Sequence, residues 1–187
     1  MTVTVRIRRA EPNDASFLQA VRAEPSAARF QPLRPYSEQQ LRAIFERRAM
    51  MSLDRRLDGK VQWVILADDR AAGWISLDVT SREHGIGAAG YTVSEAFQGR
   101  GIATRALRIV VDIAFAPEQV NLERLEAVAA IENIASRRVL ENAGFTPEGT
   151  ARGLLKIGRE RVDHVRYGLL RADHDALEQL GGHRLHA

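Results

Sequence analysis

The chain has 187 residues, of which 45% are apolar and 27% charged, a globular composition with room for one domain and a sizeable core. Its 27 basic and 24 acidic residues leave a net charge of +3, and without a basic run or an RNP-like aromatic motif a nucleic-acid partner is not expected. The absence of cysteine excludes disulfides, thiolate metal sites and a cysteine nucleophile, and it fits a cytoplasmic enzyme. The sequence has no run of about 18 apolar residues, so we expect no membrane span.

The first third of the chain is predicted to hold one strand and two helices. Residues 3–9 alternate between apolar and polar side chains, as a half-buried strand does. Residues 11–24 predict a helix, and the proline-containing stretch 25–36 reads as a loop. A second helix is expected over 37–57, because Ser37 opens a capping-box pattern.

After residue 60 apolar and polar residues alternate with a period of two, as in strands, and further along the chain strands and helices are both expected. The expected order is a hairpin of two strands, a third strand, a helix, a strand, a short helix and two final strands, over residues 61–67, 72–80, 86–95, 102–114, 122–131, 133–144, 144–157 and 162–170. We therefore expect an α+β protein with one domain over 1–172, followed by a tail over 173–187 that is frayed or disordered.

The segment "QGRGIA", residues 98–103, joins a predicted strand to a predicted helix, where unpaired N–H groups and a partial positive charge favour phosphate. A Walker loop would need Lys after Gly101, where Ile102 stands, and a dinucleotide fingerprint would need Gly or Ala at Thr104. The pattern Gln/Arg-x-x-Gly-x-Gly/Ala, the pyrophosphate loop of coenzyme A, is satisfied by Gln98, Gly101 and Ala103. A bare turn with incidental glycines is the remaining alternative.

Three stretches extend this match: "GYTVSEAFQGRGIATRAL", "LERLEAVAAIENIASRRVLENAGFTPEGTAR" and "RVDHVRYGLL". Through them the chain resembles the GNAT N-acetyltransferase superfamily and, within it, the RimJ/RimL-type branch. The resemblance implies a mixed, mostly antiparallel sheet that is splayed around the coenzyme site and flanked by helices. It also implies acetyl-CoA as co-substrate, a small-molecule or peptide amine as acceptor, and no metal. A monomer and a homodimer are both compatible with it.

The resemblance also implies a role for particular residues. The backbone of Val93 would bind the pantetheine arm, with its N–H facing the thioester carbonyl. Asn133 would contact the pantetheine, although it is also a good helix cap, and Arg138 would lie near the nucleotide end. Ser136 would protonate the leaving thiolate, although on a short helix it could simply be solvated. The pyrophosphate would be held by the backbone of Gln98, Gly99, Arg100, Gly101, Ile102, Ala103 and Thr104.

Ala88 departs from the family pattern, because that branch often has a glutamate there as a candidate base. Replacement bases could be Asp78, Glu83, His84 or Asp163, which the sequence does not rank. An alternative function is therefore a catalytically weak acyl-CoA-binding sensor or scaffold.

The resemblance implies that residues 25–40 and 153–164 line the acceptor site. Cations outnumber acids in both segments, which favours a negatively charged acceptor over a polycation. The acceptor could be a protein N-terminus, an amino-acid or peptide-like metabolite, or an antibiotic amine. Trp63 and Trp74 are expected in the core or its walls, and His183 and His186 at the surface. The acceptor-site side chains would be Arg29, Phe30, Arg34, Tyr36, Lys156, Arg159, Arg161, Asp163 and His164.

Overall fold

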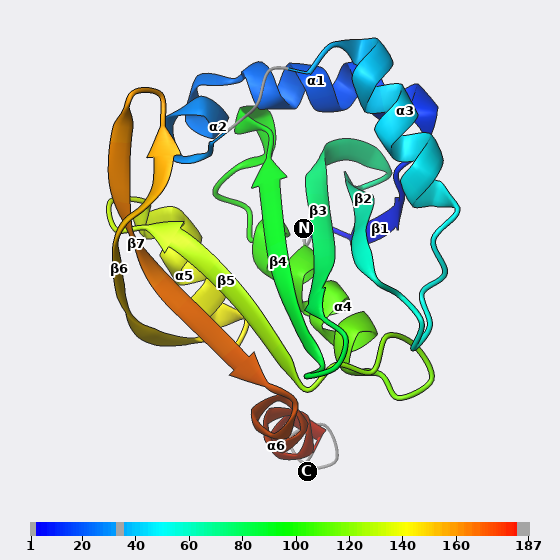
Figure 1. Ribbon diagram of the computed structural model, residues 1–187, viewed down its shortest axis with the longest axis vertical. Helices are drawn as coiled ribbons and strands as arrows, with labels where there is room; N and C mark the ends of the chain where they lie inside the picture. The colour runs from blue at the N-terminus through cyan, green and yellow to red at the C-terminus, as the bar shows by residue number, and fades with distance from the viewer. Residues whose placement is uncertain (1–2, 33–35, 183–187) are drawn as a thin grey trace.

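A seven-stranded sheet with the order β1-β2-β3-β4-β5-β7-β6 runs through the computed structural model, which describes residues 3–32 and 36–182 (Figure 1). All neighbouring strands are antiparallel except β4 and β5. The α+β prediction is therefore confirmed. The strands are β1 (Val5–Arg9), β2 (Gly59–Ala67), β3 (Arg70–Ser81), β4 (Ile86–Val93), β5 (Arg124–Ala130), β6 (Thr146–Ile157) and β7 (Glu160–Leu170).

The sheet is splayed between β4 and β5. These two strands pair only where Ile86–Ala88 lies beside Arg124–Glu126, and beyond that point they diverge (Figure 1). The end of β4 and the end of β5 therefore each have an edge without a neighbouring strand. This opening carries the candidate site.

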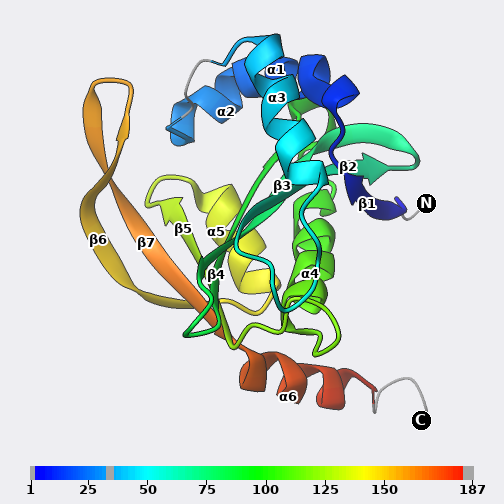
Figure 2. The same cartoon turned by 45° about the vertical axis from the view of Figure 1, so that its right-hand side comes forward.

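Helices cover both faces of the sheet (Figure 2). One face packs against α4 (Ile102–Phe115) and α5 (Ile134–Asn142), and the other against α1 (Ala15–Ala23) and α3 (Glu38–Ala49). Helix α4 forms because its apolar residues recur at helical spacing. Seven of them are at most 3% exposed: Ile102, Ala106, Leu107, Val110, Val111, Ala114 and Phe115. Each large side chain buried in this way contributes about 1.5–3 kcal/mol relative to exposure, which fixes the start of α4 against the sheet.

The prediction of a loop from residue 25 was wrong in its first half, because α2 (Pro25–Phe30) is a helix there. Proline was read as a breaker, but Pro25 stands in the first turn. At that place its fixed φ suits a helix and its missing N–H costs nothing. The second helix keeps the predicted capping box at Ser37 but ends at Ala49. Two single turns of 3₁₀ helix, Pro12–Asp14 and Glu95–Phe97, complete the elements.

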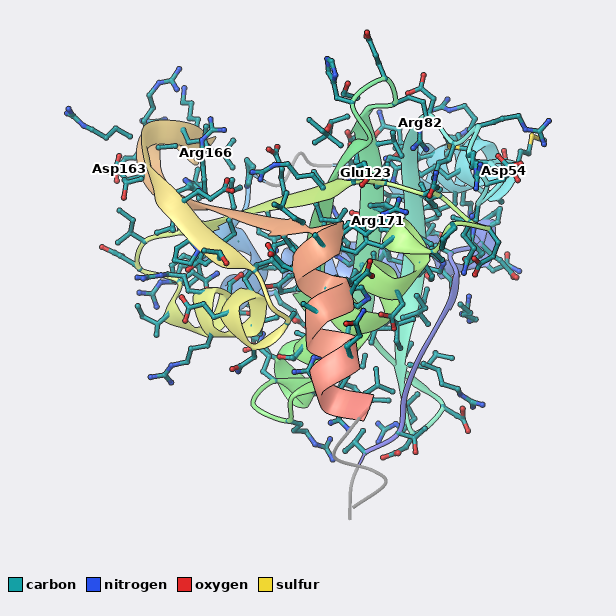
Figure 3. All side chains as sticks on the ribbon, turned by 90° about the horizontal axis from the view of Figure 1, so that it is seen from below. Asp54, Arg82, Glu123, Asp163, Arg166 and Arg171 are labelled. Atoms are coloured by element: carbon teal, nitrogen blue, oxygen red, sulfur yellow. The ribbon has the colours of Figure 1, made fainter. Side chains whose placement is uncertain are left out.

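The C-terminal segment begins as helix α6 (Arg171–Gly182), which starts inside the predicted domain. Arg171 lies beside Glu123 at 3.2 Å, and its Nε donates to the carbonyl oxygen of Leu122 at 2.9 Å (Figure 3). The ring of His174 packs against Phe115, with 5.5 Å between centroids. The first part of the expected tail is therefore docked, whereas His183 and His186 lie outside the described residues.

Candidate functional site

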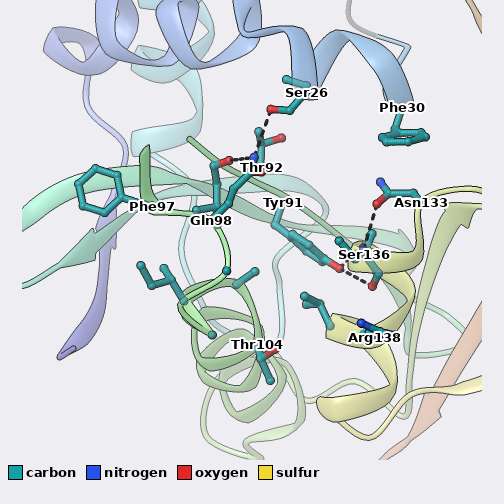
Figure 4. A pocket seen from close by; sticks show the side chains of 18 of the residues that line it. Ser26, Phe30, Tyr91, Thr92, Phe97, Gln98, Thr104, Asn133, Ser136 and Arg138 are labelled. Carbon is teal, nitrogen blue, oxygen red and sulfur yellow. Dashed lines mark hydrogen bonds between the residues drawn. The ribbon is translucent and has the colours of Figure 1, made fainter. Parts of the chain in front are cut away.

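A cleft of about 490 Å³ lies where β4 ends and α4 begins, with α5 and α2 as its other walls (Figure 4). Ten of the eleven site residues expected from the sequence line it, and they come from three separate elements. The exception is Arg100, an exposed loop residue whose carbonyl oxygen accepts from Arg105 at 2.7 Å. The ten are Val93, Gln98, Gly99, Gly101, Ile102, Ala103, Thr104, Asn133, Ser136 and Arg138.

The loop before α4 depends on two left-handed glycines. Gly99 has φ 73° and Gly101, the N-cap of the helix, has φ 69°. A Cβ at Gly99 would meet nothing within 4 Å, so the backbone angle rather than lack of space requires glycine. The first-turn N–H groups of α4 have no intrahelical acceptor, and no Asp or Glu is among the described residues that line the cleft. With Arg138 in the opposite wall, the loop fits a diphosphate.

The free edge of β4 presents backbone groups to the opening. The N–H of Ser94 donates to the carbonyl oxygen of Ala72 on β3 at 2.8 Å. Because backbone direction alternates along a strand, the N–H of Val93 points away from β3 and toward the opening. The carbonyl oxygen of Val93 accepts from Gln98 Nε2 at 2.9 Å. An N–H donor in this position could stabilise negative charge on a carbonyl oxygen.

Asn133 and Ser136 are joined at the start of α5 (Figure 4). The Oδ1 atom of Asn133 accepts from the N–H of Ser136 at 3.0 Å, so Asn133 acts as the helix cap. The hydroxyl of Ser136 lies 3.0 Å from the phenol oxygen of Tyr91, which also donates to the carbonyl oxygen of Ser136 at 3.1 Å. A carbonyl oxygen only accepts, so with the Tyr91 hydrogen there, the Ser136 hydroxyl is the donor between the two side chains.

Tyr91 is a cleft residue that the sequence reasoning missed. Burial raises the pKa of its phenol, which the hydrogen bond to Ser136 only partly offsets, so Tyr91 stays protonated at neutral pH. The signal was available in "GYTV", just before the glycine loop, but a tyrosine in a strand is more often a core residue. The two hydroxyls together form a short path along which a proton could move.

Helix α2 is fastened to the cleft by side chains that no sequence motif marks. Glu24 accepts from the Ser94 hydroxyl at 2.7 Å and from the N–H of Glu95 at 2.9 Å. The Ser26 hydroxyl accepts from Gln98 Nε2 at 3.1 Å (Figure 4). These contacts tie α1 and α2 to the loop that precedes α4.

Gln31, which directly follows α2, also connects this segment to β4. Gln31 Nε2 donates to the carbonyl oxygen of Tyr91 at 3.1 Å and to Thr92 Oγ1 at 2.8 Å. The α2 segment therefore occupies part of the free edge of β4 and forms the roof of the cleft.

The replacement bases proposed for the missing glutamate are scattered. Glu83 and His84 lie in the turn before β4, at the opposite end of the strand from the cleft. Asp163 accepts from the N–H of Gly153 at 2.6 Å within the β6–β7 hairpin. Asp78 is the cross-strand neighbour of Ala88 and lies 3.9 Å from Lys60 Nζ.

The side chains expected at the acceptor site lie only in part around two cavities next to the cleft. A cavity of about 320 Å³ adjoins the cleft, and a pocket of about 220 Å³ adjoins that cavity. Of those side chains, Phe30 and His164 line the first and Tyr36 lines the second. The cations in their walls are Arg22, Arg48 and Lys60, whereas Arg34 lies outside the described residues. Not among the wall residues are Arg29, Lys156, Arg159, Arg161 and Asp163.

Within residues 3–32 and 36–182, no three His, Cys, Asp or Glu side chains are grouped to hold a metal ion. No helix of that part of the chain is long and apolar enough to cross a membrane.

Comparison with known proteins identifies the fold and the family. The chain is 40% identical over 108 residues to the probable N-acetyltransferase YjcK of Bacillus subtilis, covering 57% of this chain and 59% of that protein. It is 24% identical over 147 residues to a spermidine N(1)-acetyltransferase of Escherichia coli, covering 78% and 75%. The solved structure of Mycobacterium smegmatis RimJ in complex with CoA-disulfide superposes with a TM-score of 0.78, at 25% identity over 90% of this chain and 84% of that one. The profile of an acetyltransferase (GNAT) domain matches residues 4–146, and the chain therefore belongs to the GNAT acetyltransferase family.

Proposed function

We propose that the chain transfers the acetyl group of acetyl-CoA to a primary amine by direct attack in a ternary complex. The main support for this proposal is that a glycine loop and a free strand edge meet in one cleft. The left-handed glycine loop at the start of α4 opens onto the unpaired edge of β4. A long ligand with a diphosphate at one end and a polar, amide-containing arm would meet suitable groups along its whole length.

The chain's own residues have distinct tasks in this proposal. Backbone N–H groups from Gln98 to Thr104 bind the diphosphate, and Arg138 adds a positive charge. The N–H of Val93 donates to the thioester oxygen as it gains charge. When bound, acetyl-CoA supplies the activated acetyl group, and no covalent intermediate on the enzyme is required.

The hydroxyl pair completes the reaction. As the new N–C bond forms and the C–S bond breaks, the attacking nitrogen releases a proton and the leaving sulfur takes one from Ser136, whose hydroxyl is restored by a proton delivered through water. Tyr91, which is hydrogen-bonded to Ser136 and stays protonated, holds that hydroxyl in place. Asn133 contributes by fixing the first turn of α5, and it has a side chain in the cleft for the pantetheine arm.

A second candidate function rests on Ala88, where the branch that this chain resembles often has glutamate. Without a carboxylate there, the fold could hold an acyl-CoA as a sensor or scaffold. A free α-amine with a pKa near about 8 still reacts without a strong base, whereas a lysine amine near about 10.4 costs roughly 4 kcal/mol to deprotonate at neutral pH. The proposed enzyme is therefore best suited to amines of low pKa.

Two measurements separate these functions. Titration calorimetry with acetyl-CoA tests the cleft, and release of free thiol in the presence of an amine panel tests transfer. Binding with amine-dependent thiol release supports the enzyme. Binding without it supports the sensor, and no binding contradicts both. The relatives named above do not decide the amine, since one is a spermidine N(1)-acetyltransferase and another is RimJ.

A further inference from the structure

Two connected cavities lie on the face of the sheet that α1 and α3 cover. The larger, of about 320 Å³, shares Tyr91, Asn133 and Ser136 with the cleft. The smaller, of about 220 Å³, shares Lys60 and Trp74 with the larger one. Together they lead from the hydroxyl pair into the layer between the sheet and the two helices.

Two buried polar atoms without partners belong to residues of the larger cavity. They are Nε1 of Trp74, a residue 9% exposed, and Nε2 of His164, a residue 1% exposed. Buried polar groups nearly always have a hydrogen-bond partner, so two unpaired ones on residues that line one cavity favour an occupant that supplies both partners. The two residues come from β3 and β7, on opposite sides of the splay.

These two atoms require opposite partners. An indole N–H can only donate, so Trp74 requires an acceptor. Nδ1 of His164 lies 2.8 Å from the carbonyl oxygen of Val162, which can only accept, so Nδ1 carries the hydrogen. In the neutral ring Nε2 then presents a lone pair, and His164 requires a donor.

The charge of the cavity walls favours an anionic occupant, as the unpaired donor of Trp74 does. Arg22 and Lys60 line the larger cavity, Arg48 lines the smaller, and no Asp or Glu is among the described residues that line either. Asp78 lies 3.9 Å from Lys60 Nζ and also acts electrostatically on Arg48. Burial lowers the pKa of Lys60, and Asp78 only partly offsets this effect. A ligand anion beside Lys60 would therefore stabilise its buried positive charge.

We propose that these cavities bind an amine that also carries a carboxylate, with the carboxylate at Trp74, Lys60 and Arg22 and the amine at His164. The amine end then lies at the boundary with the cleft, beside Tyr91 and Ser136, where the acetyl group would be. The body of the acceptor packs against apolar walls that include Phe30 and Leu155. This inference rests on the proposed acetyl transfer and specifies its acceptor as amino-acid-like rather than polycationic.

His164 gains a chemical task in this arrangement. Nε2 accepts the proton that the attacking nitrogen loses as the N–C bond forms, and the sulfur takes one proton as the C–S bond breaks. His164 then returns this proton through water to Ser136, which supplied the one on sulfur, so both groups are restored and the proton count balances without an added reactant. A histidine on β7 would replace the carboxylate that is missing at Ala88 on β4.

The test compares amines that share one body. L-phenylalanine, L-phenylalaninamide and 2-phenylethylamine differ in the carboxylate, and spermidine is the polycationic contrast. We expect kcat/KM, expressed per unprotonated amine, to be at least tenfold higher for L-phenylalanine than for the other three. Equal values, or spermidine as the best acceptor, would overturn the inference while leaving acetyl transfer intact. Failure of the whole panel with acetyl-CoA still bound would overturn it too, and failure to bind acetyl-CoA would instead remove the proposed function.

Matched variants locate the carboxylate. The chain has two lysines, Lys60 and the exposed Lys156 on the β6–β7 hairpin. Lys60→Met should reduce the preference for L-phenylalanine to less than threefold, whereas Lys156→Met should preserve it. The same loss in both variants, or in neither, contradicts the assignment.

Binding without turnover gives an independent readout. In Trp63→Phe the remaining tryptophan is Trp74. With CoA present, the fluorescence emission of Trp74 should change on adding L-phenylalanine but not on adding 2-phenylethylamine, and an identical response to both would contradict the site.

His164→Asn keeps a donor for the carbonyl oxygen of Val162 but lacks Nε2, so it should lower kcat at least tenfold for every amine while calorimetric binding of acetyl-CoA is unchanged. An unchanged kcat would remove His164 from the reaction.

Discussion

A carboxylate placed in the glycine loop provides the most direct test of the diphosphate site. Gly101→Asp adds a Cβ that meets one atom within 4 Å, Arg105 Nη2 at 3.7 Å, so there is space for the side chain. Arg105 is already held by the carbonyl oxygens of Arg100 and Gly101. Arg105 also lies close enough to pair with the new carboxylate, so the high-dielectric end of the range below is the appropriate one.

The expected size of this effect follows from Coulomb's law. Two unit charges about 6 Å apart repel by roughly 0.7 kcal/mol at a dielectric of ~80 and about 2.8 kcal/mol at ~20. A diphosphate presents about two such charges, so the low estimate is about 1.4 kcal/mol, which is a factor of ten in affinity. We expect the dissociation constant of acetyl-CoA to rise at least tenfold at low salt, and less at high salt.

Gly101→Asn is the matched control. Asparagine has nearly the same shape and the same tolerance of φ 69°, and each substitution should cost about 1 kcal/mol of backbone strain. The difference between the two variants then isolates the charge. If titration calorimetry gives the same acetyl-CoA affinity for both, or if Gly101→Asp matches the unmodified protein, the diphosphate does not lie at this loop.

Three further predictions concern the hydroxyl pair, a close strand contact and a partly buried ion pair. Ser136→Ala should lower kcat about 10²-fold with little change in the KM for acetyl-CoA, and Tyr91→Phe should lower kcat less, since it leaves the Ser136 hydroxyl in place; an undiminished kcat for Ser136→Ala in steady-state kinetics would contradict proton donation. Gly73→Ala would bring a Cβ to 2.1 Å from the carbonyl oxygen of Thr92, so it should displace β4 and lower the free energy of unfolding by about 1–3 kcal/mol, whereas a denaturation midpoint equal to that of the unmodified protein would show that the strands yield. Burial raises the pKa of Asp14, but hydrogen bonds from Arg8 and from the N–H of Glu11 outweigh it, so the pKa is lowered overall and the carboxylate stabilises the fold above pH about 4 and loses that contribution as the pH falls further. Asp14→Asn should therefore cost about 1–2 kcal/mol at pH 7 and little below pH 3, and a cost that does not vary with pH in urea unfolding would exclude the linkage.

The cleft was predictable because its residues form a continuous motif. Gln98 to Thr104 are adjacent in the chain, and the left-handed angles of Gly99 and Gly101 are what a residue without a Cβ allows. Asn133 was recognisable as a helix cap by the same kind of local rule, whereas the role expected of Ser136 came from the family resemblance. Local rules were therefore sufficient for the loop and for the cap.

The proposed acceptor site was less predictable because its residues come together only through tertiary packing. Lys60, Trp74 and His164 lie on three strands, and no local pattern relates them. Charge counting over the two expected segments selected Arg29, Lys156, Arg159 and Arg161, which are near in sequence but do not line the cavities. The polar contacts of Glu24 were missed for the same reason, since Ser94 is 70 residues away.

The short pairing of β4 with β5 has a consequence for the hydrogen exchange of backbone amides. Tyr91 and Val93 lie in the middle of the sheet order, yet their N–H groups face an edge without a strand. In the free protein these amides should exchange with solvent faster than that of their neighbour Ser94, which is bonded to Ala72. An extended ligand that bonds to this edge would take the place of the missing strand, and protection would then appear at Tyr91 and Val93 with little change at Ser94.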